Sequence, residues 1–230
     1  MPTAARVYID VIITAGLAIA VYGVFHWNSL GAATFALFLA LFAGAALLKG
    51  RIPGITGTYS PVFFFVLVGS TVLSFSEIVF AAGLAGLVQC TCFVQRRPSA
   101  VQIVFNAANL MISTASAFAF ISGGLPALSD QPLLIRLILG AAVYYLVNTG
   151  LVSVVVTLVD SKPIQHVWSS WCLGSLPYYV FGALIAGATL SAQNHPSLYA
   201  VGMVCPSVLL ATVYYRYWLS SSTQLNPLVS

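Results

Sequence analysis

The feature that most constrains this chain is a series of long apolar runs, separated only by short stretches of Gly, Pro, Ser and charged residues. Of its 230 residues, 60% are hydrophobic and only 5% are charged, whereas soluble domains carry roughly 25% charged residues. So few charges cannot cover a surface that faces water. We therefore predict that lipid solvates most of this chain, and the lipid bilayer is its first expected partner.

The apolar runs predict a bundle of transmembrane helices. A spanning helix needs about 20 mostly apolar residues, and inside a bilayer only helices and closed barrels satisfy every backbone hydrogen bond. The strict alternation of a barrel strand is absent. We expect an all-α, polytopic bundle of about eight spans, at residues 7–25, 30–48, 61–75, 77–94, 101–121, 133–157, 172–192 and 198–219. The third is short, so it would recruit Thr58 to Ser60 or thin the bilayer.

The basic residues predict the orientation, because short loops rich in Lys and Arg stay cytoplasmic. With eight spans, one face collects seven of the eight: Arg6, Lys49, Arg51, Arg96, Arg97, Lys162 and Arg216. Only Arg136 lies near the other face. Both termini are then cytoplasmic, with a membrane domain at 1–219 and a cytoplasmic tail at 220–230. The net charge of +4 follows from topology and contact with anionic lipid, and we predict no binding to nucleic acid.

The first span has a rival interpretation as a cleaved signal peptide, since Ala18-Ile19-Ala20 ends an apolar run. Asp10 lies inside that run, one helical turn after Arg6. An i,i+4 pair of these two residues near an interface would suit a retained helix better than a cleaved one.

The fifth span carries a polar stripe, with residues spaced four, three, four and three: Gln102, Asn106, Asn109, Ser113 and Ser116. These spacings place them on one helical face. At a rise of roughly 1.5 Å per residue, Asn106 and Asn109 lie about 8 to 12 Å deep, and Asn148 and Gln89 about 9 to 14 Å. The five amides could therefore meet in the inner half of the bundle. They would serve either as contacts between helices or as a site for a polar ligand.

Other residues suggest less chemistry. Pro177 and Pro206 lie inside the last two spans, where each would kink its helix and form a conformational hinge.

Four residues would share the outer face, either as a joint pH-sensing or cation site or as separate solvated loop residues: His26, Glu77, Asp130 and His195. The four cysteines are expected to be small, reduced, buried residues and not metal ligands: Cys90, Cys92, Cys172 and Cys205.

No enzyme signature is present. The sequence lacks a phosphate-binding Gly-Lys loop, a nucleophile elbow and a metalloprotease His-Glu pattern. Four acidic residues leave little material for acid–base catalysis. No charged residue lies near mid-membrane, which argues against a proton-coupled pump. We predict a non-enzymatic protein without cofactor or metal.

Several short motifs resemble the multi-span membrane sensor regions at the N-termini of bacterial signalling proteins. They are Leu48-Lys49-Gly50-Arg51-Ile52-Pro53-Gly54 with Gly57-Thr58-Tyr59-Ser60, Val88-Gln89, Phe105-Asn106-Ala107-Ala108, Asn148, and Pro206 followed by Tyr215-Arg216-Tyr217-Trp218. In that family the last helix leads into an HD-type phosphodiesterase, a GGDEF cyclase or a histidine kinase. Here a Ser-rich tail follows Leu219. The resemblance implies a freestanding sensor module or a truncated relative.

Three functions remain open. A sensor in the bacterial inner membrane would relay a membrane or small-ligand signal to a cytoplasmic signalling protein through the end of the eighth span. A permease would use the amide stripe to line the path of a small neutral or weakly polar solute. A structural or assembly protein would use the same amides only to hold its helices together. Each function is compatible with a homo-oligomer.

Overall fold

The computed structural model describes residues 1–49, 60–92, 98–160, 163–168 and 173–224. These residues form helices and no strand, which confirms the all-α prediction. Three of the helices are long and apolar enough to cross a membrane: α1, α5 and α6. The bounds are α1 Thr3–Phe25, α2 Ala32–Leu47, α3 Val62–Gly69, α4 Phe75–Thr91, α5 Ala100–Ile121, η1 Pro126–Leu128, α6 Leu133–Asp160, α7 Ile164–Val167, α8 Leu173–Ser191 and α9 Pro196–Gln224.

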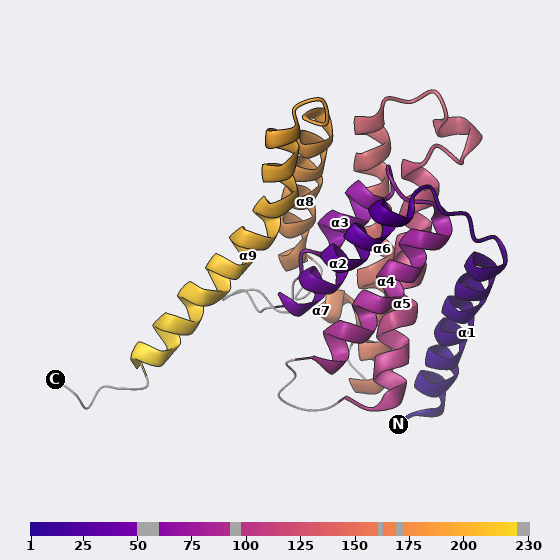
Figure 1. The fold of residues 1–230 in the computed structure, drawn as a ribbon. Helices are drawn as coiled ribbons and strands as arrows, with labels where there is room; N and C mark the ends of the chain where they lie inside the picture. The colour runs from indigo at the N-terminus through magenta and orange to yellow at the C-terminus, as the bar shows by residue number, and fades with distance from the viewer. Residues whose placement is uncertain (50–59, 93–97, 161–162, 169–172, 225–230) are drawn as a thin grey trace.

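Helix α5 is the hub of the bundle. It packs closely against α1, α4 and α6, while α8 packs against α3 and α6. Helix α9 packs chiefly on α8, and its C-terminal half stands clear of the other helices (Figure 1). The N-terminal end of α1 and the C-terminal end of α9 both lie toward the lower edge of Figure 1.

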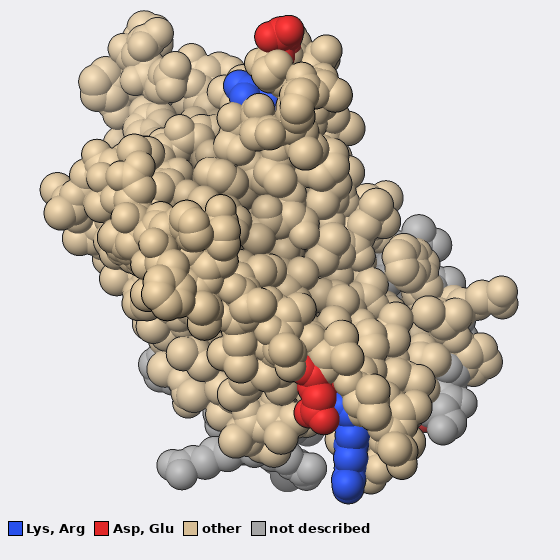
Figure 2. Space-filling view, turned by 90° about the vertical axis from the view of Figure 1, so that its right-hand side faces the viewer, with Lys and Arg blue, Asp and Glu red and all other residues tan. Residues whose placement is uncertain are grey.

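The outer surface of the bundle suits contact with lipid. Figure 2 shows charged side chains only near the two ends of the face in view, with a broad uncharged band between them. Helix α1 turns large apolar side chains outward along its whole length, each more than half exposed: Val7, Val11, Leu17, Val21 and Val24. Such a surface is expected where the solvent is hydrocarbon and not water.

Only part of the third predicted span, 61–75, is helical, because α3 covers Val62–Gly69 and the next helix starts at Phe75. Helix α3 has only 8 residues, which rise about 12 Å. The hydroxyls of Ser70 and Thr71 donate back to the carbonyls of Val66 and Val68 and end the helix. Ser74 then caps a new one. Ser60 precedes α3 and does not extend it.

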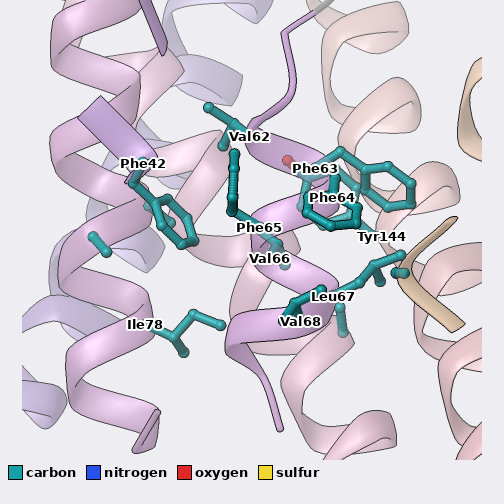
Figure 3. Packing of buried hydrophobic residues seen from close by; sticks show 14 of the residues in the cluster. Phe42, Val62, Phe63, Phe64, Phe65, Val66, Leu67, Val68, Ile78 and Tyr144 are labelled. Atoms are coloured by element: carbon teal, nitrogen blue, oxygen red, sulfur yellow. The ribbon is translucent and has the colours of Figure 1, made fainter. Parts of the chain in front are cut away.

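All eight residues of α3 are buried. Figure 3 shows their side chains spreading toward Phe42 of α2, Ile78 of α4 and Tyr144 of α6. A helix with no solvated face belongs inside a bundle. The short length of α3 is therefore compatible with a membrane only because other helices surround it.

Close contacts between backbones fix α5 in place. A Cβ on Gly86 of α4 would lie 2.7 Å from Cα of Ala107, and one on Gly16 of α1 would lie 2.7 Å from Cα of Ala108. Small residues at such crossings let helix backbones approach closely, which is how helices pack in the absence of a hydrophobic driving force.

The ion pair expected between Arg6 and Asp10 is wrong. Both side chains are exposed, and in the described part of α1 they form no ion pair. The backbone carbonyl of Asp10 instead accepts a hydrogen bond of 2.7 Å from Thr14. An exposed ion pair contributes little to stability, so no specific interaction is needed to keep Arg6 and Asp10 apart.

Some predictions fall on residues that the structure does not describe. Of the basic residues used for topology, Arg51, Arg96, Arg97 and Lys162 lie outside the described ranges, as do Thr58, Cys172 and most of the Lys49–Ser60 motif. Helix α9 continues to Gln224, past the predicted end of the last span at Leu219, and 225–230 lie outside the described chain.

Candidate functional site

A partly buried chain of hydrogen bonds joins three helices. Nδ2 of Asn109 on α5 donates to Oδ1 of Asn148 on α6 at 2.6 Å. Nδ2 of Asn148 donates to the hydroxyl of Tyr179 on α8 at 2.9 Å. The structure thus brings together two of the five predicted amides and adds a tyrosine. We call Asn109, Asn148 and Tyr179 the polar chain.

The polar chain has an open end at Asn109. The side chain of Asn109 is 3% exposed, and its Oδ1 has no hydrogen-bond partner among the described residues. Ser113 donates to the backbone carbonyl of Asn109, not to its side chain. A buried acceptor left unpaired is unfavourable by about 1 to 3 kcal/mol. The end of the chain on α5 could therefore accept a further donor.

The other end of the polar chain lies among aromatic rings. The ring centroid of Tyr179 lies 4.7 Å from that of Phe63 on α3, 5.0 Å from Tyr145 and 5.1 Å from Tyr178. Figure 3 shows Phe63 beside Tyr144, with centroids 5.0 Å apart. A movement of Tyr179 would therefore displace the rings packed against it on α3 and α6 as well as on α8.

Sequence reasoning missed these tyrosines. The signal that could have found them is the pair of Tyr-Tyr repeats, Tyr144-Tyr145 and Tyr178-Tyr179, in the middle of otherwise apolar runs. A tyrosine hydroxyl that deep in a bundle needs a hydrogen-bond partner.

The backbone just before α3 is held by side chains of its neighbours. The hydroxyl of Ser60 donates to the carbonyl of Ala45, near the end of α2, at 2.6 Å. The hydroxyl of Tyr178 on α8 donates to the carbonyl of Ser60. Backbone outside a helix is tolerated at membrane depth only where protein groups satisfy it. Helix α8 therefore binds both the polar chain and the start of α3.

The other predicted amides go elsewhere. Oε1 of Gln102 accepts from the backbone N–H of Ser99 at 2.9 Å and closes a capping box at the start of α5. Nδ2 of Asn106 donates to Sγ of Cys90 on α4 at 3.2 Å and to the carbonyl of Gln102 at 3.0 Å. Gln89 is half-buried and makes no side-chain hydrogen bond to the described residues. The amides of the predicted stripe bond to different partners because α5 packs against a different helix on each side.

A groove opens beside Gln102 and Asn106, between the start of α5 and the facing parts of α1 and α6. Its volume is about 450 Å³, within the range of small-molecule sites. Valines of α6 and Phe105 form most of its wall, and Ser99, Gln102, Asn106 and Asp160 supply polar groups. We call this the inner groove.

The two prolines lie within continuous helices, Pro177 in α8 and Pro206 in α9. Proline removes the hydrogen bond to the carbonyl four residues earlier, which for Pro206 is that of Gly202. A Cβ on Gly202 would collide with Thr189 of α8. The weakened turn of α9 thus coincides with its crossing of α8. That both prolines are hinges stays a prediction.

Glu77 is not a solvated loop residue. Its side chain is 0% exposed, and its carboxylate accepts from the hydroxyl of Ser29 at 2.7 Å and from the backbone N–H of Ser74 at 2.9 Å. It therefore caps α4 and ties the α1–α2 loop to it. In the part of the chain that the structure describes, no three His, Cys, Asp or Glu residues gather to hold a metal ion.

Comparison with known proteins identifies no relative of this site. No family model matches the chain, and neither a curated protein nor a solved structure matches it. Its function must therefore be inferred from the contacts themselves.

Proposed function

We propose that this chain is a non-enzymatic, multi-pass protein of the bacterial inner membrane, which senses a membrane or small-ligand signal and relays it to a cytoplasmic partner through α9. One observation carries the proposal. The polar chain starts on α5 with an unpaired acceptor and ends on Tyr179 of α8, the helix on which α9 chiefly packs. A change at Asn109 therefore has a contiguous physical route to α9.

Helix α9 has the features of an output element. Near its start, Met203 is buried and Gly202 crosses α8 at Thr189. Its C-terminal part leaves the bundle (Figure 1). A long helix attached at one crossing turns a small displacement of α8 into a larger one at its far end. Shifts of packed helices by about 1 to 2 Å are a common form of switching.

The path of the chain favours an even number of crossings. Ser60 lies beside the end of α2, and α4 begins beside the loop between α1 and α2. The segment that contains α3 thus returns the chain to the end from which α2 started, and it acts as one interrupted crossing. We therefore propose eight crossings with both termini in the cytoplasm and with Lys49 and Arg6 on the inner side.

The experiment tests whether the polar chain sets the position of α9. In a background without native cysteines, spin labels at exposed Val21 of α1 and Val208 of α9 report their separation. Asn148→Leu removes both hydrogen bonds and is expected to shift or broaden that distance distribution by about 2 Å. Gly202→Leu, at the crossing of α9 and α8, should also shift or broaden this distance distribution. Asn106→Leu, outside the polar chain, is the matched control and should change nothing.

A tagged pull-down from bacterial membranes supplies the second readout. A cytoplasmic signalling protein recovered with the wild type should be recovered several-fold less with Asn148→Leu and normally with Asn106→Leu. An unchanged position of α9 in Asn148→Leu, together with no signalling partner under any condition, would contradict the proposal.

The inner groove favours a second candidate, a permease for a small neutral or weakly polar solute. Asn106 and Gln102 line the groove, as two amides of the predicted stripe would if the groove were the path of such a solute. In that case, proteoliposomes should take up radiolabelled glycerol faster than empty liposomes, and Asn106→Leu should slow uptake. Equal uptake by the wild type, the variant and empty liposomes would remove this candidate.

A further inference from the structure

Arg136 of α6 is held against the turn that follows α5. Gly123 in that turn has a φ of 75°, a conformation in which glycine is favoured. A Cβ on Gly123 would lie 2.5 Å from Nη1 of Arg136. The guanidinium therefore rests directly on the backbone of Gly123, and a side chain at that position would displace it.

The guanidinium has donors but no acceptor. The side chain of Arg136 is half-buried, and its Nε is shielded from solvent without a hydrogen-bond partner. Across the described residues it forms no ion pair. The nearby acid, Asp130, is exposed and accepts from its neighbour Ser129 at 3.4 Å. A partly desolvated guanidinium with five donors is costly to leave unpaired.

The turn itself offers further donors. Ser122 is in the right-handed helical region and Gly123 in the left-handed region, a sequence of conformations that forms anion-binding concavities from successive backbone N–H groups. The N–H of Ser122 donates to the carbonyl of Phe118. Those of Gly123 and Gly124 make no hydrogen bond within the described chain.

Attraction to the C-terminal end of α5 explains part of this arrangement, because a helix C-terminus carries partial negative charge. It does not explain the unpaired donors, since no carbonyl of the described α5 accepts from Arg136. The guanidinium thus keeps donors from which no described residue accepts.

We propose that Arg136, with the backbone of Gly123 and Gly124, binds a phosphate or carboxylate group at the end of the bundle opposite the N-terminal end of α1. A guanidinium matches the two oxygens of either group in a planar fork. The group can belong to a lipid headgroup or to a free anion. The site is independent of the polar chain and of the relay through α9.

The experiment uses the full chain in phosphatidylcholine nanodiscs, with two arms. In the first, binding of inorganic phosphate and of acetate is measured by microscale thermophoresis. In the second, phosphatidylglycerol carried through purification is counted by native mass spectrometry. Arg136→Gln is expected to weaken phosphate binding or lipid retention by at least about tenfold. Arg6→Gln, which removes an exposed arginine at the N-terminal end of α1, is the matched control and should alter neither arm.

Two further variants keep the proposal testable if Arg136→Gln folds poorly. Arg136→Lys keeps the charge but loses the fork, so binding should fall by a few-fold. Asp130→Asn removes a nearby negative charge and should strengthen binding. A loss of lipid retention alone identifies a lipid headgroup as the ligand. A loss of phosphate or acetate binding alone identifies a free anion. Binding in both arms that is equal in the wild type, Arg136→Gln and Arg136→Lys would overturn the proposal.

Discussion

Replacing Phe65 by alanine is expected to lower the free energy of unfolding by about 3 kcal/mol. Phe65 lies in the middle of α3, is 1% exposed and has its ring centroid 6.4 Å from that of Phe42 on α2. The cavity left behind cannot close easily, because every residue of α3 is buried. In lipid the gain from leaving water is small, so the loss comes chiefly from packing.

Unfolding in mixed micelles with increasing dodecyl sulfate, followed by circular dichroism, measures this change. Phe80→Ala on α4 is the matched control, since Phe80 is 50% exposed and its loss should change the unfolding free energy by less than about 1 kcal/mol. Equal losses in the two variants would show that α3 is not packed at the centre of the bundle.

Replacing Glu77 by alanine is expected to destabilise the protein by about 2 to 4 kcal/mol, because both a helix cap and a buried charged hydrogen bond disappear. The chain offers a natural comparison. Gln102 closes the same kind of capping box at α5, but it is exposed and uncharged, so Gln102→Ala should lower stability by only about 0.5 to 1 kcal/mol.

The same micelle titration compares the two caps. Glu77→Gln keeps the shape and the two acceptor contacts in part, so its stability should fall between the wild type and Glu77→Ala. If Glu77→Ala and Gln102→Ala lose equal stability, the contact between Ser29 and Glu77 does not stabilise the fold.

The candidate site shows which contacts residue spacing can predict and which it cannot. Depth counting placed Asn109 and Asn148 at similar levels, and the structure joins them at 2.6 Å. The same counting grouped Asn106 with them, and helical spacing added Gln102, yet these two bond to Cys90 and Ser99. Spacing gives the height of a residue in the membrane and the face of its own helix, but it does not identify the helix that lies opposite.

The α3 segment shows the limit for secondary structure. Residues 61–75 are as apolar as any span, and hydropathy cannot distinguish a long helix from a short one followed by a turn. The local signals were Ser70, Thr71 and Ser74, whose hydroxyls compete with the helical backbone for hydrogen bonds. They end α3 and start α4.

The sequence by itself determined that this protein is helical and suited to lipid, because length, apolar content and scarcity of charge are properties of each segment alone. Only the tertiary structure decided that α3 is short and enclosed, that Tyr179 completes the polar chain, and that Glu77 and Arg136 are partly or wholly buried at the bundle's end. These depend on which helices become neighbours. That choice depends on small residues such as Gly86 and Gly16, where backbone contact is set by the shapes of two helices together.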